Sequence, residues 1–156
     1  GKPLTVTDPT MTRFLMSLDE SVALVQYAFE NAQPGDLFVR KAPASTIADL
    51  ARAVALLLGI PEPEITVIGT RHGEKLFESL LSREEMSKAE DRGGYYRVPL
   101  DARSLDYGLF VEDGEQEVAE LTDYTSHNTT RLDIEQTAAL IEKLPGMQKV
   151  LAEVGR

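Results

Sequence analysis

Hydrophobic positions recur at helical spacing in several stretches of the chain. In residues 17–31, Val22, Val25 and Phe29 fall on one stripe, which is the pattern of a helix that buries one face. In the stretch that begins near Ser45, apolar residues continue until Gly59, and a glycine just past the last turn is a common helix stop. The predicted helices are Ser17–Asn31, Ser45–Leu58, a helix from near Lys75 through Leu81, Ser82–Glu90, Leu132–Leu144 and a short one over Met147–Val154.

Short β-branched runs lie between these helices. We predict strands at residues 5–7, 36–40 and 64–69, and an extended segment over residues 95–99. The order strand, helix, strand, helix indicates an α/β protein. The strands at 36–40 and 64–69, each followed by a helix, are expected to form a small sheet.

The predicted fold class is therefore a small mixed α/β domain. We expect residues 1–94 to form this α/β domain. Residues 95–156 are expected to form an irregular C-terminal extension that ends in a helix and packs on the same domain or on a partner subunit, since residues 101–131 show no sustained periodicity. Gly1 in place of an initiator Met suggests a cleaved tag or an excised piece of a longer protein, and a natural processed start is the alternative.

Charge and composition narrow the possible partners. The formal net charge is −10, so phosphate-rich surfaces would be repelled, and neither nucleic acid nor a membrane is an expected partner. No apolar run reaches the roughly 18 residues that a membrane span needs. There is no cysteine, which excludes disulfides and thiolate zinc sites and fits a cytoplasmic location.

The segment Gly69–Lys75 follows a predicted strand and precedes a predicted helix. Ligands bind at such strand ends in open α/β sheets. Arg71 could fork onto phosphate oxygens, Glu74 could accept hydrogen bonds from a diol such as ribose, and the glycines let backbone approach a ligand. The alternative interpretation is an ordinary charged, solvated turn.

A second candidate segment is residues 8–14, in which Arg13 stands between hydroxyl-bearing and aromatic residues. Arg13 could be a second phosphate ligand. The alternative is a surface arginine without a ligand.

A metal site is not expected. His72 and Glu74 have the His-x-Glu spacing of zinc deaminases, but the cysteine ligands of those enzymes are absent. Nothing in the sequence places His127 beside His72. We expect His127 to make local backbone hydrogen bonds in a turn.

Three catalytic signatures are absent from the 156 residues. Gly-x-Gly-x-x-Gly does not occur, so no dinucleotide fingerprint is present. Gly-x-Ser-x-Gly does not occur, which argues against a hydrolase nucleophile elbow. No tyrosine is followed four residues later by lysine, and we assign no catalytic residue to this chain.

Five motifs nevertheless occur in an order that resembles one known group. In order, they are Thr7-Asp8-Pro9-x-Met11-Thr12-Arg13-Phe14, Ile68-Gly69-Thr70-Arg71-His72-Gly73-Glu74-Lys75, Arg83-Glu84-Glu85-Met86, Tyr95-Tyr96-Arg97-Val98-Pro99 and Ser126-His127-Asn128-Thr129. The chain resembles the C-terminal, substrate-binding portion of bacterial polysaccharide-biosynthesis UDP-N-acetylglucosamine 4,6-dehydratases that also invert C5. Relatives in that group have been labelled 4-epimerases.

The resemblance implies an extended short-chain dehydrogenase of capsule or O-antigen biosynthesis. Its whole enzyme would use NADP or NAD, bound by an N-terminal Rossmann domain that this chain lacks, so that the chain alone binds no cofactor and is inactive. The reaction implied is hydride removal at C4 of the sugar, loss of water across C5–C6 and hydride return at C6. The whole enzyme is also expected to be a homo-oligomer.

The same resemblance assigns substrate-binding residues. Arg13 and Arg71 would contact the diphosphate of a UDP-sugar and Glu74 the uridine ribose, while Phe38 and Lys41 would lie near the uracil. One departure occurs at residues 101–107, where relatives commonly carry several asparagines and this chain carries none.

Two other functions remain open from the sequence. The chain could be a free-standing module that binds a UDP-sugar, or a structural or oligomerisation module without a ligand. An upstream glycine fingerprint in the same reading frame would favour the dehydratase or epimerase.

Overall fold

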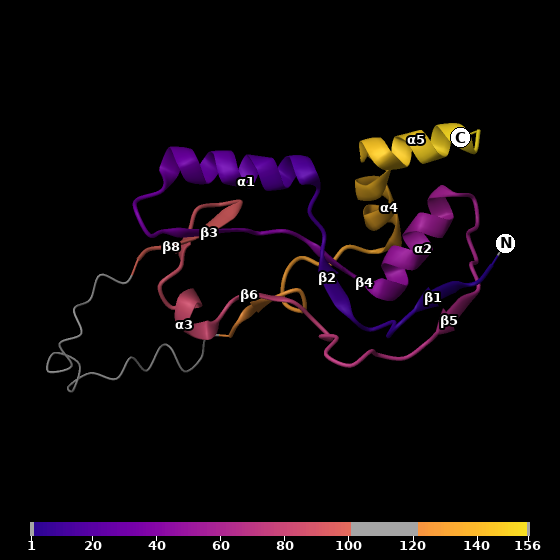
Figure 1. The fold of residues 1–156 in the computed structure, drawn as a ribbon, viewed down its shortest axis with the longest axis horizontal. Helices are drawn as coiled ribbons and strands as arrows, with labels where there is room; N and C mark the ends of the chain where they lie inside the picture. Colours follow the sequence, from indigo (N-terminus) through magenta and orange to yellow (C-terminus); the bar gives the residue numbers. More distant parts are fainter. Residues whose placement is uncertain (1, 101–121, 156) are drawn as a thin grey trace, which may run out of the picture. The chain divides into compact units, whose positions relative to one another are not determined.

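The computed structural model describes residues 2–100 and 122–155, which form a small mixed α/β structure of helices and short strands (Figure 1). The predicted fold class is confirmed. The helices are α1 (Leu18–Asn31), α2 (Ile47–Leu57), α3 (Arg83–Met86), α4 (Ile134–Glu142) and α5 (Pro145–Glu153). The strands are β1 (Leu4–Val6), β2 (Thr12–Phe14), β3 (Leu37–Arg40), β4 (Ala44–Thr46), β5 (Ile65–Val67), β6 (Ser79–Leu81), β7 (Glu90–Asp91), β8 (Tyr95–Val98) and β9 (Tyr124–Thr125).

The chain divides into two compact units, each built from segments that are distant in sequence. The first unit comprises Gly1–Ser17, Ala42–Glu78 and Ser126–Arg156, and the second comprises Leu18–Lys41 and Ser79–Thr125. Each unit thus contains residues from both sides of position 94. The expected division into residues 1–94 and 95–156 stays a prediction.

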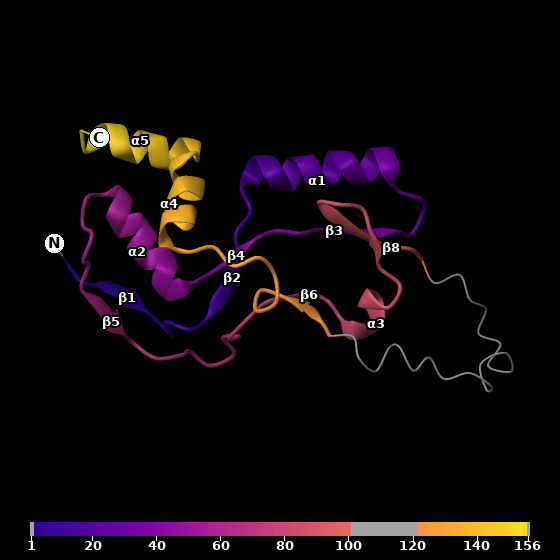
Figure 2. The same ribbon diagram turned by 180° about the vertical axis from the view of Figure 1, so that it is seen from behind.

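The first unit combines two small sheets with three helices, and both ribbon views show β1 and β5 side by side (Figures 1 and 2). β1 pairs with β5 in parallel, and β2 pairs with β4 antiparallel. Helix α2 packs on α4 around a core of Ala53, Ala138 and Ile141. The small alanine side chains let the two helix backbones come close together.

Capping side chains fix where α2 and α4 begin. The Thr46 side chain accepts a hydrogen bond from the backbone N–H of Asp49, and Asp133 and Gln136 form a reciprocal capping box at the start of α4. Gly59, with φ of 81°, follows the end of α2. The predicted helices over these two stretches are therefore confirmed.

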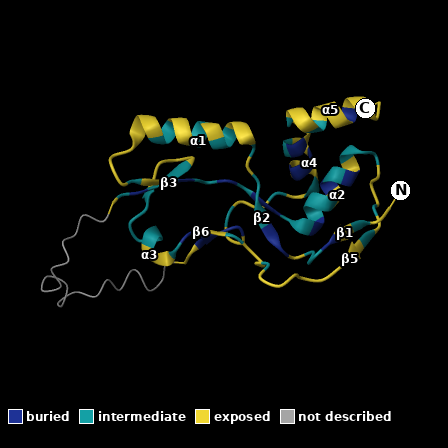
Figure 3. Cartoon of the chain, in the orientation of Figure 1, coloured by how far each residue is buried: buried dark blue, intermediate teal, exposed yellow. Residues whose placement is uncertain are grey.

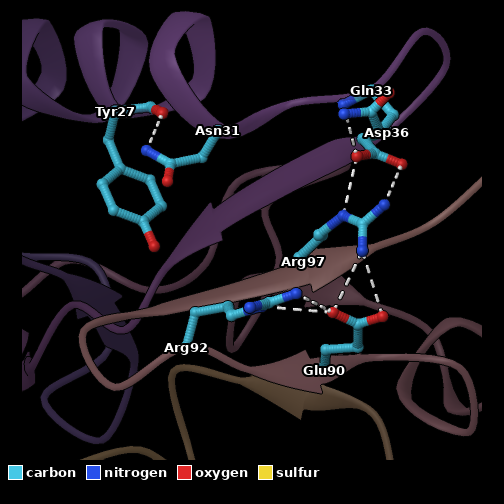
Figure 4. Close-up of polar contacts among 7 residues, drawn as sticks. All are labelled: Tyr27, Asn31, Gln33, Asp36, Glu90, Arg92 and Arg97. Carbon is cyan, nitrogen blue, oxygen red and sulfur yellow. Dashed lines mark hydrogen bonds and ion pairs between the residues drawn. The ribbon is translucent and has the colours of Figure 1, made fainter.

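The second unit is built on an antiparallel sheet in the order β3-β8-β7, with α1 against β3. Arg97 joins the strands of this sheet through ion pairs with Asp36 and Glu90 (Figure 4). Tyr27 of α1 stacks on Tyr95 of β8, with ring centroids 4.2 Å apart. No residue of α1 is buried, although the helix carries the predicted apolar stripe (Figure 3).

The helix predicted from Lys75 through Leu81 is wrong. Residues 75–78 are irregular, and Ser79–Leu81 forms β6, which pairs antiparallel with β9. The Glu78 side chain accepts a hydrogen bond from the backbone N–H of Phe14. Partners that are distant in sequence supply the hydrogen bonds of this segment. Its helical spacing of apolar residues therefore does not determine its conformation.

The helix predicted at Ser82–Glu90 is mostly wrong. It is limited to the single turn of α3, which begins with a capping box between Ser82 and Glu85. By residue Glu90 the chain is already in β7, which pairs with β8. The predicted start of the helix thus agrees with α3, but its predicted length does not.

The expected common sheet of the strands near residues 36–40 and 64–69 is also wrong. β3 pairs with β8, and β5 pairs with β1. Strand pairing depends on contacts far apart in sequence, which the order of elements does not reveal. The extended conformation predicted for residues 95–99 is confirmed as β8, and the last two predicted helices correspond to α4 and α5.

Within residues 2–100 and 122–155, no helix is both long enough and apolar enough to cross a membrane. The asparagine-poor segment at 101–107 lies outside the described residues.

Candidate functional site

The candidate site lies in the first unit, where two parallel strands end. β1 and β5 run in the same direction, with Val6 opposite Val67, so the segments that follow them emerge at the same edge. Thr7 directly follows β1, and the Gly69–Lys75 segment follows β5. This places two of the sequence motifs at the edge where α/β sheets bind ligands.

A hydrogen bond joins these two segments. The Thr7 hydroxyl donates to Glu74 Oε1 over 3.2 Å, although the residues are 67 positions apart. The other carboxylate oxygen, Oε2, accepts from the backbone N–H of Arg71 at 3.1 Å. A carboxylate accepts about four hydrogen bonds, so Glu74 keeps acceptor capacity for a ligand such as a ribose diol.

Residues 71–74 form a tight turn. The backbone N–H of Glu74 donates to the Arg71 carbonyl over 3.1 Å. Gly73, at the third position of the turn, has φ of 80°, which is the φ that a type II turn requires there. A Cβ at Gly73 would meet no atom within 4 Å, so the glycine is needed for backbone conformation and the space beside it is open.

Arg13 reaches the same loop from β2. Its Nη2 donates to the Lys75 carbonyl over 2.9 Å, and its Nη1 donates to the Thr12 carbonyl over 2.7 Å. Nη2 also lies 3.7 Å from the sulfur of Met11, and this sulfur lies 3.4 Å from the Thr7 hydroxyl oxygen. Since a guanidinium carries five N–H groups, donors remain for a ligand.

The structure thus brings Arg13, Glu74 and the backbone of Arg71 into one network of polar contacts. The Arg71 side chain itself is exposed, and within the described residues no hydrogen bond or ion pair engages its guanidinium. An exposed arginine on a loop that also carries a carboxylate and contacts a second arginine is chemically suited to a phosphorylated ligand.

The segment from Asp8 to Met11 is held by an Asx turn. Asp8 Oδ1 accepts from both the backbone N–H and the hydroxyl of Thr10, at 2.8 and 2.7 Å. The hydrogen bond from the Thr10 hydroxyl is the main cause that keeps the pKa of Asp8 below its ordinary value. This turn leads directly into Met11, which is fully buried, and so fixes the start of β2.

Phe38 and Lys41 lie in the second unit and are engaged there. The Phe38 ring packs edge-on against Tyr27, with centroids 5.6 Å apart. Lys41 Nζ forms an ion pair with Asp91 at 2.5 Å and lies 4.3 Å from the centroid of the Tyr96 ring. Their expected place near a uracil therefore stays a prediction.

His127 makes a long-range contact that the sequence did not suggest. Its Nδ1 lies 2.7 Å from the Thr12 hydroxyl, 115 residues away. Its ring packs against Phe77, with centroids 4.8 Å apart. Residues 2–100 and 122–155 contain no group of three or more His, Asp or Glu side chains arranged to hold a metal ion.

Sequence reasoning missed Thr7, Thr12 and Ser126 as supports of the site. Thr12 and Ser126 are buried and their hydroxyls meet at 2.7 Å. The sequence did offer one indication: Thr7 and Thr12 belong to the same motif as Arg13, and Ser126 belongs to the same motif as His127. Their pairing could not be seen, because nothing local connects positions so far apart.

The chain is similar to known proteins over nearly all its length. It is 55% identical over 151 residues to a UDP-glucose 4-epimerase of Rickettsia akari (strain Hartford) and 56% identical over 151 residues to one of Rickettsia canadensis (strain McKiel). Each alignment covers 97% of this chain and 44% of the relative. The chain therefore spans less than half the length of these relatives.

Among solved structures, the X-ray structure of Pen from Bacillus thuringiensis has a similar fold. The TM-score is 0.69 at 26% sequence identity, over 90% of this chain and 40% of that one. The polysaccharide biosynthesis protein family matches residues 1–100, and the C-terminal region of polysaccharide biosynthesis proteins matches residues 101–148. These matches confirm the broader part of the expectation drawn from the motifs: the chain belongs to the polysaccharide biosynthesis protein family.

Proposed function

We propose that this chain is the nucleotide-binding part of a UDP-sugar 4-epimerase or 4,6-dehydratase. The observation that carries the proposal is the Arg13–Lys75 hydrogen bond of 2.9 Å. It brings an arginine of β2 to the loop that carries Arg71 and Glu74. Two arginines and one carboxylate at one strand edge suit the diphosphate and the ribose of a nucleoside diphosphate.

Each side chain has a distinct proposed role. Arg13, which donates hydrogen bonds to two backbone carbonyls, would donate from its remaining N–H groups to one phosphate. Arg71, exposed on its turn, would close onto the other phosphate. Glu74, held by Thr7, would accept hydrogen bonds from the ribose hydroxyls. Phe38 and Lys41 stay proposed contacts of the uracil.

The names of the relatives favour epimerisation at C4 for the whole protein. The order of motifs, which resembles that of UDP-N-acetylglucosamine 4,6-dehydratases, supports dehydration as the second candidate. Capsule or O-antigen biosynthesis is the proposed setting, with the whole protein a cytoplasmic homo-oligomer.

A nicotinamide cofactor, NADP or NAD, would supply the redox chemistry of either reaction. The dinucleotide fingerprint Gly-x-Gly-x-x-Gly does not occur in these 156 residues, so we propose no cofactor contact for them. We therefore derive no catalytic step from this chain and assign it only to substrate binding.

Calorimetric titration with UDP, UMP and uridine tests the proposal. We expect UDP to bind more tightly than UMP, and uridine to bind least, because each phosphate adds charge-assisted hydrogen bonds. Arg13→Ala and Arg71→Ala should each weaken UDP binding by about tenfold or more, which corresponds to the loss of one such contact.

The matched control is Arg52→Ala, which removes an exposed arginine of α2 in the same unit. It should leave UDP affinity unchanged. Equal UDP affinity in the unchanged chain, Arg13→Ala and Arg71→Ala would contradict the proposed site. If Arg52→Ala weakened UDP binding as much as Arg13→Ala and Arg71→Ala do, the effect would come from net charge and not from the proposed site.

A further inference from the structure

Thr12, which precedes Arg13 in β2, forms a buried pair of hydroxyl groups with Ser126. Thr12 is 1% exposed and Ser126 is 0% exposed. Their side-chain oxygens lie 2.7 Å apart, although the residues are 114 positions apart in sequence. A buried polar group is costly unless it is hydrogen-bonded, so this pair requires specific partners.

The Ser126 hydroxyl uses its complete hydrogen-bonding capacity. It accepts from the backbone N–H of Glu78 over 3.0 Å and donates to the Thr12 carbonyl over 3.1 Å. The contact with the Thr12 hydroxyl is the third. A serine hydroxyl offers one donor and two acceptor positions, and all three are engaged here.

The Thr12 carbonyl links this pair to Arg13. That oxygen accepts both the Ser126 hydroxyl and Arg13 Nη1, the latter over 2.7 Å. A carbonyl oxygen has two lone pairs, so the two donors share it without competition. Ser126 and Arg13 are therefore connected through one atom, the Thr12 carbonyl oxygen.

The directions of these hydrogen bonds fix the tautomer of His127. Because the Ser126 proton is given to the Thr12 carbonyl, the Thr12 hydroxyl must donate to Ser126 Oγ. The Thr12 oxygen can then only accept from His127 Nδ1, 2.7 Å away. All contacts are satisfied together only when Nδ1 of His127 carries a proton.

We propose that Thr12 and Ser126 are positioning residues, which orient Arg13 toward the phosphates of the nucleotide and hold His127 as the Nδ1–H tautomer. This inference rests on the proposed function for its ligand and on the hydrogen-bond network for its geometry. Ser126 acts through Arg13 and does not itself touch the nucleotide.

The tautomer of His127 gives a test that is independent of any ligand. Long-range ¹H–¹⁵N correlation spectra of the labelled chain separate Nδ1–H from Nε2–H imidazoles at a pH of about 8.5, where an ordinary histidine is neutral. The chain has only two histidines, and a His72→Gln variant assigns their signals. We expect Nδ1–H for His127, and a mixture of tautomers in Thr12→Val. An Nε2–H imidazole in the unchanged chain would overturn the proposed network.

UDP affinity tests the effect on Arg13. Ser126→Ala should weaken UDP binding by about fivefold, since the carbonyl that supports the guanidinium loses one of its two donors. Thr12→Val is a second variant, in case Ser126→Ala does not fold, and should weaken binding in the same direction.

Thr137→Val is the matched control for Thr12→Val. Thr137 is 0% exposed and its hydroxyl donates to Ser45 Oγ over 3.3 Å, so the change removes an equally buried hydroxyl bond in the same unit. It should lower stability but not UDP affinity. Unchanged UDP affinity in folded Ser126→Ala and Thr12→Val would overturn this inference alone, whereas a lack of UDP binding by the unchanged chain would overturn the proposed function.

Discussion

The Asp36 carboxylate accepts two hydrogen bonds from the Arg97 guanidinium, Nε to Oδ2 at 2.7 Å and Nη2 to Oδ1 at 3.2 Å (Figure 4). The Asp36 side chain is 2% exposed. The third guanidinium nitrogen, Nη1, contacts both oxygens of Glu90 at 3.1 Å. One planar arginine thus connects the start of β3 with β7 through its own strand β8, and this geometry requires the guanidinium fork.

We expect Arg97→Lys to destabilise the second unit strongly. An ammonium group cannot make both bidentate contacts, and the buried Asp36 carboxylate would lose a partner. The melting temperature should fall by several degrees, measured by circular dichroism. Arg92→Lys is the control, because Arg92 pairs with the same Glu90 from an exposed position, and it should change the melting temperature little.

Stability should fall as the pH is lowered below about 4.5. Hydrogen bonds from Arg97 are the main cause that lowers the pKa of Asp36 below 3.8, and hydrogen bonds from Arg92 and then Arg97 lower the pKa of Glu90 below 4.5. A lowered carboxyl pKa adds stability above the ordinary value, which is lost as pH falls through the lowered value.

Urea unfolding at a series of pH values between 7 and about 3 measures this dependence. In Asp36→Asn the loss of stability on acidification should be smaller, because one of the responsible carboxylates is gone. If the variant and the unchanged chain lose stability in parallel over the whole range, Asp36 does not contribute to the acid sensitivity.

Gly73→Ala and Gly146→Ala should have opposite effects on stability. Alanine at Gly73 must adopt the left-handed φ of 80°, which costs about 1 to 2 kcal/mol. Gly146 lies in α5, where a Cβ meets no atom within 4 Å, so alanine should stabilise by about 0.5 to 1 kcal/mol. Urea unfolding measures both, and UDP titration should show weaker binding only for Gly73→Ala.

Ile141→Ala should cost about 2 to 4 kcal/mol of unfolding free energy, because it removes a buried side chain from the α2–α4 core. Phe29→Ala is the contrasting change, since Phe29 is 86% exposed on α1 and its removal should alter stability by less than about 0.5 kcal/mol. Thermal or urea unfolding of both variants checks the difference. A cost for Phe29→Ala as large as that for Ile141→Ala would show that the face of α1 is packed in solution.

The sequence by itself determined the elements whose signals are local. The starts of α2, α3 and α4 follow from capping side chains at Thr46, Ser82 and Asp133. Such signals act over three or four residues, and so the sequence shows them directly.

Tertiary structure alone decided the pairing of segments. The apolar spacing of residues 76–81 predicted a helix, but strand β9 and the Glu78–Phe14 hydrogen bond hold this stretch in an irregular and then extended form. Similarly, the order of strands predicted one sheet, whereas β3 and β5 pair with different partners. Contacts between distant segments outweigh propensities of a few tenths of a kcal/mol per residue.

The same division applies to the candidate site. The sequence singled out Arg13, Arg71 and Glu74 by residue type and motif. Only the fold decided that Arg13 meets the carbonyl of Lys75, because β2 and the loop after β5 are separated by more than fifty residues and no local rule brings them together. The parallel pairing of β1 with β5 provides the physical reason, since it directs both following segments to one edge of the sheet.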